Sequence, residues 1–143
     1  MFWLIVKQTE AKRQVLANIC SFAYNPINFE ALNRLNIIPT LLDSLQLKDD
    51  KLKEFAISGL CNLSAGICIT YLIKFICITE FKLCLIFLDP NNMHTIITNN
   101  GLNKIHKCLA QNLSNEQIII STLTLLIYSK DLNNQVSGKN FID

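Results

Sequence analysis

The sequence predicts an all-α fold, a helical solenoid of about two and a half repeats, on three observations. Residues 12–23 align with residues 53–64 at an offset of 41. Residues 26–45 align with residues 90–109 at an offset of 64, and residues 118–129 repeat residues 53–64 at an offset of 65. A period of about 41 residues is typical of helical solenoids. The four glycines and three prolines leave few tight turns for a β-rich fold.

The offsets differ because the second repeat carries 23 extra residues between Ser64 and Asp89. The repeat units are expected at about residues 11–46, at 51–110 with an insert at 66–88, and at 114–143. They form one domain over residues 11–130, and residues 1–10 and 131–143 are expected to be poorly defined ends. Because the third unit is truncated and has no polar terminal repeat, the chain is interpreted as a fragment.

The first unit predicts a long, a short and a medium helix in that order. Residues 11–23 carry apolar side chains at helical spacing, so one face is expected to be buried: Val15, Leu16, Ile19, Phe22 and Ala23. Tyr24-Asn25-Pro26 ends this helix, because the residue before a proline is driven out of the α region.

The two shorter helices follow from their caps and apolar stripes. Asn28 is the expected N-cap of the short helix, whose apolar side chains are Phe29, Leu32 and Leu35. Pro39 is tolerated in the first turn of the medium helix, because the missing N–H has no partner there. That helix carries Leu41, Leu42 and Leu45.

The second and third units repeat this pattern. Asn92 is expected to cap a short helix over 93–98, and Gly101 to form the turn before the next helix. The apolar positions of the second unit are Phe55, Ala56, Leu60, Leu63, Leu102, Ile105, Cys108 and Leu109. Ser114-Asn115-Glu116-Gln117 opens the third long helix, whose apolar side carries Ile118, Leu125, Leu126 and Tyr128. After Lys130 the pattern decays.

Composition argues against direct nucleic-acid binding and for a reducing compartment. The formal net charge is +2, and no basic run is longer than Lys12-Arg13. Phe2 to Val6 is too short an apolar run for a signal peptide. The six cysteines are therefore expected to be free thiols, and Cys20 and Cys61 occupy equivalent buried positions of two repeats.

The sequence contains no pattern of catalytic, metal-ligating or cofactor-binding residues. There is no C-x-x-C pair, and His94 and His106 have no ligand-spaced partners, so no metal site is expected. The glutamates are scattered over separate predicted helices, at Glu10, Glu30, Glu54, Glu80 and Glu116. Without a paired carboxylate, a Ser/His/Asp set or a phosphate loop, the chain is expected to be no enzyme and to need no cofactor.

Leu60-Cys61-Asn62-Leu63-Ser64, with a glycine-initiated helix beyond the insert, resembles the armadillo-repeat family. In that family a long third helix ends in L-x-N-L and is followed by a short first helix, a glycine and a second helix. Residues 11–64, and more loosely 89–129, resemble a small non-enzymatic nuclear branch of the family. That branch is associated with the minor spliceosome and pairs with a protein that carries an RNA recognition motif. The resemblance therefore implies an armadillo-type α-solenoid and a role in pre-mRNA splicing.

The resemblance also implies a binding groove lined by the long helices. In armadillo arrays an asparagine at the L-x-N-L position can bind the backbone of an extended peptide, and Asn62 matches that position. Ser21 and Ile127 replace it in the other two units, which favours a folded partner over an extended peptide. The candidate partner-binding residues are Gln14, Asn18, Ser21, Ser58 and Asn62.

The segment 66–88 permits three interpretations. Of its 23 residues, 17 are apolar, and a segment of this length and composition could span a membrane. Lys74 and Glu80 weigh against a span, since each costs roughly 2.5 to 3.5 kcal/mol near a bilayer centre. The segment alternatively forms an extra helix that needs cover on the protein. The favoured interpretation is a retained intron, because its Ile, Phe, Leu, Lys and Tyr bias fits AT-rich codons and its length equals the excess in the repeat.

The leading functional hypothesis is thus a nuclear scaffold that binds a protein partner, an RNA-binding protein with an RNA recognition motif. A cytoplasmic location is the alternative to the nucleus. The alternative function is a membrane-associated armadillo-type adaptor anchored by residues 66–88.

Overall fold

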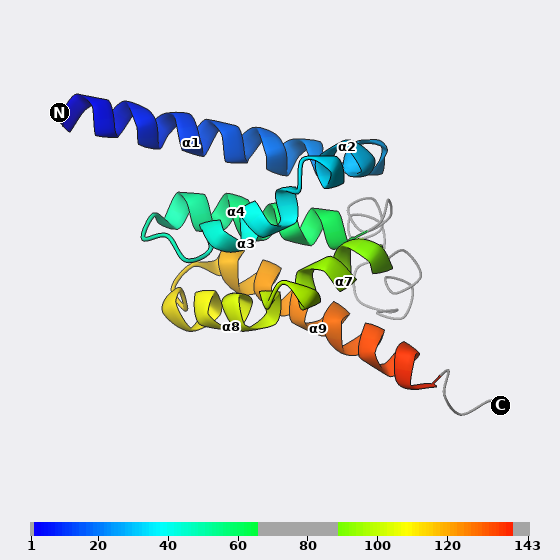
Figure 1. Ribbon diagram of the computed structural model, residues 1–143. Helices are drawn as coiled ribbons and strands as arrows, with labels where there is room; N and C mark the ends of the chain where they lie inside the picture. Colours follow the sequence, from blue (N-terminus) through cyan, green and yellow to red (C-terminus); the bar gives the residue numbers. More distant parts are fainter. Residues whose placement is uncertain (1, 66–88, 139–143) are drawn as a thin grey trace, which may run out of the picture.

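The computed structural model of the protein describes residues 2–65 and 89–138 (Figure 1). Helices and turns make up the described residues, and no β-strand occurs among them, which confirms the all-α prediction for this part of the chain. The elements are α1 (Phe2–Phe22), η1 (Pro26–Asn28), α2 (Phe29–Arg34), α3 (Ile37–Ser44), α4 (Asp50–Ser64), α7 (Pro90–Thr98), α8 (Gly101–Gln111) and α9 (Glu116–Gly138). The predicted insert at 66–88 lies outside the described residues.

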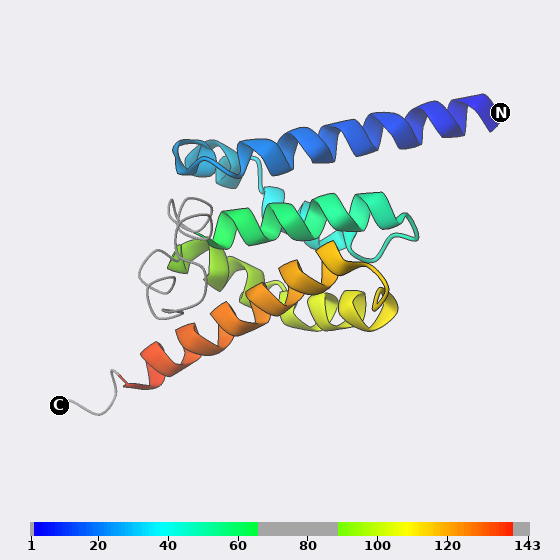
Figure 2. The ribbon, with the colours of Figure 1, turned by 180° about the vertical axis from the view of Figure 1, so that it is seen from behind.

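The three long helices lie side by side and run in the same direction (Figure 1). Helix α4 is central, because it packs against α1 on one side and against α9 on the other. Seen from behind, α1, α4 and α9 follow one another from the top of the molecule to the bottom (Figure 2). The shorter helices α3, α7 and α8 pack on the opposite side of this layer.

The core lies between the long helices and the shorter ones. Helix α4 supplies Ile57, Leu60 and Leu63, which are fully buried. The other large side chains buried to the same degree are Leu41, Leu42, Leu45, Met93, Ile96, Ile105, Ile118 and Leu125. Burial of an aliphatic side chain of this size contributes about 1.5–3 kcal/mol. These residues belong to one hydrophobic cluster that extends from Leu16 of α1 to Leu125 of α9.

Asparagine and aspartate side chains begin the helices, but not at every predicted position. Asn25 caps η1 by accepting from the backbone N–H of Ile27, and Asp89 caps α7 by accepting from that of Asn92. Asn28 is the N-cap residue of α2, as predicted, but its side chain makes no capping hydrogen bond. The prediction that Asn92 is a cap is wrong, because Asp89 occupies that position. Asn28 Nδ2 donates to the carbonyl of Phe22 (3.0 Å), and Asn92 Nδ2 donates to that of Leu63 (2.9 Å).

The turns before α3 and α8 share one backbone conformation. Asn36 and Asn100, which are 64 residues apart, both adopt the left-handed region, with φ of 51° and 57°. Asparagine tolerates this region better than most residues. Gly101 follows directly, and a Cβ there would lie 2.3 Å from the carbonyl oxygen of Ile96. The glycine predicted at this turn is thus needed for close packing, and its own φ is not positive.

The ends of the long helices differ from the prediction. Helix α1 begins at Phe2 instead of residue 11, and α9 continues past Lys130 to Gly138. Both extensions lie where the repeat pattern is weak. The helices continue there because backbone hydrogen bonds propagate a helix without an amphipathic pattern. Pro39 lies in the first turn of α3, as predicted.

Part of the predicted apolar face of α1 is exposed. Leu16 and Ala23 are buried against α4, but Val15 is 54% exposed and Phe22 59% exposed. The equivalent positions on α4 are Ala56 and Leu63, which are fully buried. Helix α3 covers one side of α4, but no described helix covers the corresponding side of α1. The predicted burial of Val15 and Phe22 failed for this reason. Leu35, predicted in the short helix, follows its last residue and is 71% exposed.

Candidate protein-interaction surface

The long helices expose equivalent positions on one side. Ala17, Ser58 and Leu123 occupy one repeat position, and Ser21, Asn62 and Ile127 occupy the next turn. On α4 these side chains are half-buried, whereas Ser21, Leu123 and Ile127 are exposed. We name these six residues the long-helix face. It spans all three long helices, which Figure 2 shows one below the other.

Two of the candidate residues lie elsewhere on α1. Gln14 and Asn18 are exposed and bond to each other, with Gln14 Nε2 donating to Asn18 Oδ1 over 3.0 Å. The position on α4 equivalent to Asn18 is Gly59, which packs between Leu41 and the backbone of Cys20. By this equivalence Asn18 points away from α4. The structure therefore places Ser21, Ser58 and Asn62 on the long-helix face and Gln14 and Asn18 beside it.

Asn62 is engaged within the protein. Its Nδ2 donates to the backbone carbonyl of Cys20 over 3.1 Å, from α4 to the last turn of α1. The other final carbonyls of α1 accept from backbone N–H groups: Ile19 from Ala23, Ser21 from Tyr24, and Phe22 from Asn25. Without Asn62 the Cys20 carbonyl would lack a donor of this kind. Asn62 thus joins two long helices, a role that its choice as a partner-binding residue did not include.

Sequence reasoning also missed an apolar row on α9. Ile120, Leu123 and Ile127 are 54%, 46% and 38% exposed, although α9 buries Ile118 and Leu125 on its other side. Their spacing of three and four residues places them on one face of a helix. That spacing was readable in the sequence, but the all-apolar stretch around it concealed which side faces the core.

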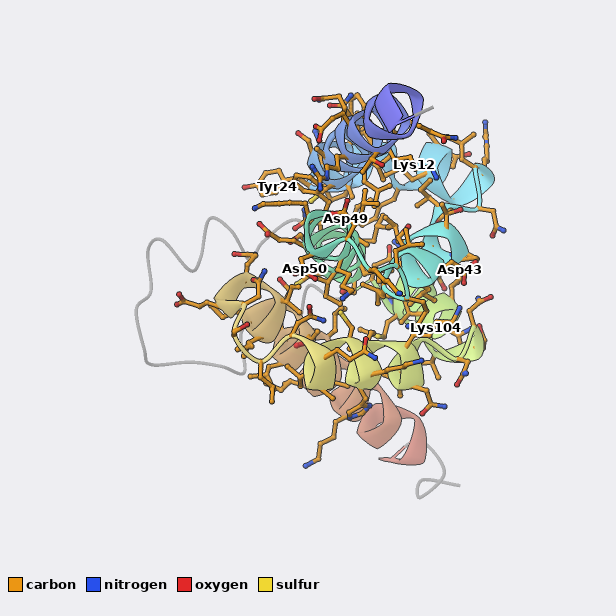
Figure 3. All side chains as sticks on the ribbon, turned by 90° about the vertical axis from the view of Figure 1, so that its left-hand side faces the viewer. Lys12, Tyr24, Asp43, Asp49, Asp50 and Lys104 are labelled. Atoms are coloured by element: carbon orange, nitrogen blue, oxygen red, sulfur yellow. The ribbon has the colours of Figure 1, made fainter. Side chains whose placement is uncertain are left out.

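A polar hollow adjoins this row where α4 and α9 begin. It encloses about 710 Å³, is open to solvent, and is lined by Asp50, Glu54, Ser114, Asn115, Glu116, Gln117 and Ile120. Figure 3 shows Asp50 at the start of α4, beside the first turns of α9. Among the described residues, no lysine or arginine lines the hollow. Sequence reasoning missed it because its residues come from two segments that are at least 60 positions apart.

Asp49 anchors the start of α4 beside this hollow. Its carboxylate accepts from the N–H groups of Lys51 and Leu52 and pairs with Arg13 of α1 over 2.9 Å. Burial acts to raise the pKa of Asp49, but hydrogen bonds from Arg13 and from these N–H groups outweigh it and hold the pKa below its usual range. The carboxylate stays ionised at neutral pH and ties α1 to α4.

The described cysteines are free and their thiols are protonated at neutral pH. Burial raises the pKa of Cys61 to about 12, with a smaller contribution from nearby Cys20. Burial also raises the pKa values of Cys20 and Cys108. Because the thiolate is the nucleophile, these positions are suited to packing and not to covalent chemistry. Cys68, Cys77 and Cys84 lie outside the described residues.

Within residues 2–65 and 89–138, no three His, Cys, Asp or Glu side chains cluster as a metal site would require. None of the helices described in these two stretches is long and apolar enough to cross a membrane. The membrane hypothesis rests on residues 66–88, which lie outside them.

The described residues define an all-α fold with an exposed face across its long helices. No family model matches the chain. Armadillo repeat-containing protein 7 from Mus musculus is 48% identical to it over 52 residues. The match covers 36% of this chain and 26% of the mouse protein's length, and gives weak support for an armadillo-repeat relation.

Proposed function

We propose that this protein is a non-catalytic scaffold, an armadillo-type α-solenoid of about two and a half repeats, that binds a folded protein partner. The observation that carries the proposal is the long-helix face, where three adjacent helices present side chains that the core does not use. Aliphatic groups exposed together are typical of interaction sites.

Equivalent contacts in the two units support the repeat architecture. Asn28 and Asn92 each donate to the carbonyl near the end of the preceding long helix, and Asn36 and Asn100 share the left-handed conformation. Helix packing alone does not require the same side chain to make the same bond twice. A repeated unit explains both pairs.

The finer function rests on the resemblance to a small nuclear branch of the armadillo-repeat family. The proposed partner is an RNA-binding protein with an RNA recognition motif, and the proposed setting is the minor spliceosome in the nucleus. The partial identity with the mouse protein supports the armadillo-repeat relation on which this resemblance rests, and not the partner or the setting. The scaffold itself is proposed to make no direct contact with nucleic acid, in keeping with its net charge of +2.

A pull-down with matched variants tests the proposal. The tagged chain is co-expressed with candidate RNA-recognition-motif proteins of the same organism. Ser58→Arg and Leu123→Arg place a bulky charge on the long-helix face and are expected to lower capture at least about tenfold, as loss of a well-packed contact does. Leu35→Arg is the control, because Leu35 is 71% exposed outside this face. Equal capture by all variants with native circular dichroism would place binding elsewhere.

Cell fractionation separates the nuclear scaffold from the membrane adaptor. Recovery in the soluble nuclear fraction is expected. A carbonate-resistant membrane pellet would instead support the alternative in which residues 66–88 anchor the chain.

A further inference from the structure

The acidic hollow and the apolar row on α9 form one continuous surface. Ile120 belongs to both, since it lines the hollow and begins the row that continues through Leu123 and Ile127. The row extends over eight residues, from Ile120 to Ile127, or about 10 Å along the helix. The surface therefore combines an anionic end with an aliphatic strip.

Three carboxylates line the hollow, from Asp50, Glu54 and Glu116, and they outnumber the two lysines that pair with them. Asp50 contacts Lys53 at 3.3 Å and Glu54 contacts Lys51 at 3.0 Å, but neither lysine lines the hollow. Asp50 and Glu116 lie in the first turns of their helices, where a carboxylate also stabilises the helix end. Glu54 lies beyond the first turn of α4, where its pair with Lys51 is three residues apart on the same helix.

Helix α9 leaves the apolar strip uncovered by the described part of the chain. Its buried positions alternate with the exposed ones, and the exposed fractions of 54%, 46% and 38% fall along the helix away from the hollow. Single exposed aliphatic residues are ordinary on protein surfaces, but three on one helical face beside an anionic hollow match an amphipathic ligand.

We infer that this surface docks an amphipathic helix of the partner protein, with lysine or arginine side chains in the hollow and aliphatic side chains against Ile120, Leu123 and Ile127. This inference rests on the proposed scaffold function and specifies the chemistry of its partner. An apolar face laid against a helix supplies affinity. Opposite charge at one end fixes the direction of the docked helix.

Two synthetic peptides test the charge requirement on the full chain. Both carry leucines at a spacing of three and four residues over three helical turns; one has two lysines at one end and the other has glutamates there. Fluorescence anisotropy measures their affinities at low and high salt. The lysine peptide is expected to bind about tenfold more tightly at low salt, and the difference shrinks at high salt, since surface pairs are screened.

Matched variants locate the peptide. Glu54→Gln is expected to remove most of the preference for lysine, and Leu123→Ser to weaken the lysine peptide about tenfold through lost apolar burial. The controls are Glu30→Gln and Leu35→Ser, which change exposed residues of the same types outside this surface. They are expected to leave both affinities unchanged.

Equal affinity of the two peptides, or an equal effect of the control variants, overturns the inference. If neither peptide binds while Leu123→Arg still blocks capture of the RNA-recognition-motif partner, the inferred helix is wrong and the scaffold function stands. If neither peptide binds and no variant of the long-helix face lowers that capture, both the inferred helix and the proposed scaffold function are wrong.

Discussion

Asn92 is a buried polar residue that links the two units. It is 1% exposed, donates to Leu63 and accepts from Asn33 Nδ2 over 2.8 Å. Asn92→Ala removes both bonds and leaves the Leu63 carbonyl without this donor, so a loss of about 1–3 kcal/mol in the free energy of unfolding is expected. Urea denaturation measures it.

The matched control for Asn92 is its repeat equivalent. Asn28→Ala removes one bond at a half-buried site, where water can replace the donor. Its expected cost is about 0.5–1.5 kcal/mol. A larger effect at Asn28 than at Asn92 would contradict this ranking.

Gly59 and Gly101, the two described glycines of the core, differ in how closely other atoms approach the position that a Cβ would occupy. A Cβ at Gly101 would lie 2.3 Å from a backbone oxygen, whereas one at Gly59 would lie 3.3 Å from Leu41 Cδ1, a side chain that can shift. Gly101→Ala is expected to cost at least about 1–3 kcal/mol through overpacking. Gly59→Ala is expected to be close to neutral, because the helix propensity of alanine offsets the contact by about 1 kcal/mol. Thermal denaturation of both variants decides between these outcomes.

At the scale of the element, the start of α4 carries a pH-dependent contribution. The folded pKa of Asp49 is lowered, so its stabilisation is present above the unfolded pKa and is lost as pH falls through the folded one. Asp49→Ala is expected to lower stability by about 0.5–2 kcal/mol at neutral pH, as loss of an N-cap does. The variant should also lose less stability than the native protein between neutral and acidic pH. Parallel pH curves would show that Asp49 contributes nothing to this slope.

Helices α1 and α4 share a pattern but not an environment, and equivalent substitutions distinguish them. Leu63→Ala is expected to cost about 2–5 kcal/mol, because the side chain is fully buried. Phe22→Ala, at the equivalent position of α1, is 59% exposed and should cost well under half as much. Similar losses in urea denaturation would mean that α1 is covered in solution.

These helices also show how far sequence reasoning reaches. The self-match located the three long helices, the proline in α3 and the all-α class, because periodicity reports directly on local structure. It could not show that Val15 and Phe22 lack a neighbour, since burial depends on which helix packs alongside. The roles of Asn62 and Asn92 were missed for the same reason. Both bond to carbonyls that are distant in sequence.

At the scale of the whole molecule, the two sides of the 66–88 segment meet. The Asp89 N–H donates to the Ser64 carbonyl over 3.0 Å. In the first unit Tyr24 alone separates Ala23 from Asn25, and Ala65 can separate Ser64 from Asp89 in the same way. A chain lacking residues 66–88 is therefore expected to keep the described helices and its urea midpoint. Circular dichroism measures both, and loss of the cooperative transition would show that the fold needs the segment.

Because Ser64 and Asp89 are in contact, the stability of the fold depends only weakly on the number of residues that connect them. The entropy of closing a loop grows slowly, by about 0.6 kcal/mol for each doubling of its length. Selection on stability therefore acts weakly on how many residues connect the two ends. It is a natural point for length variation during evolution, and a suitable place to graft a reporter domain without disturbing the helices on either side.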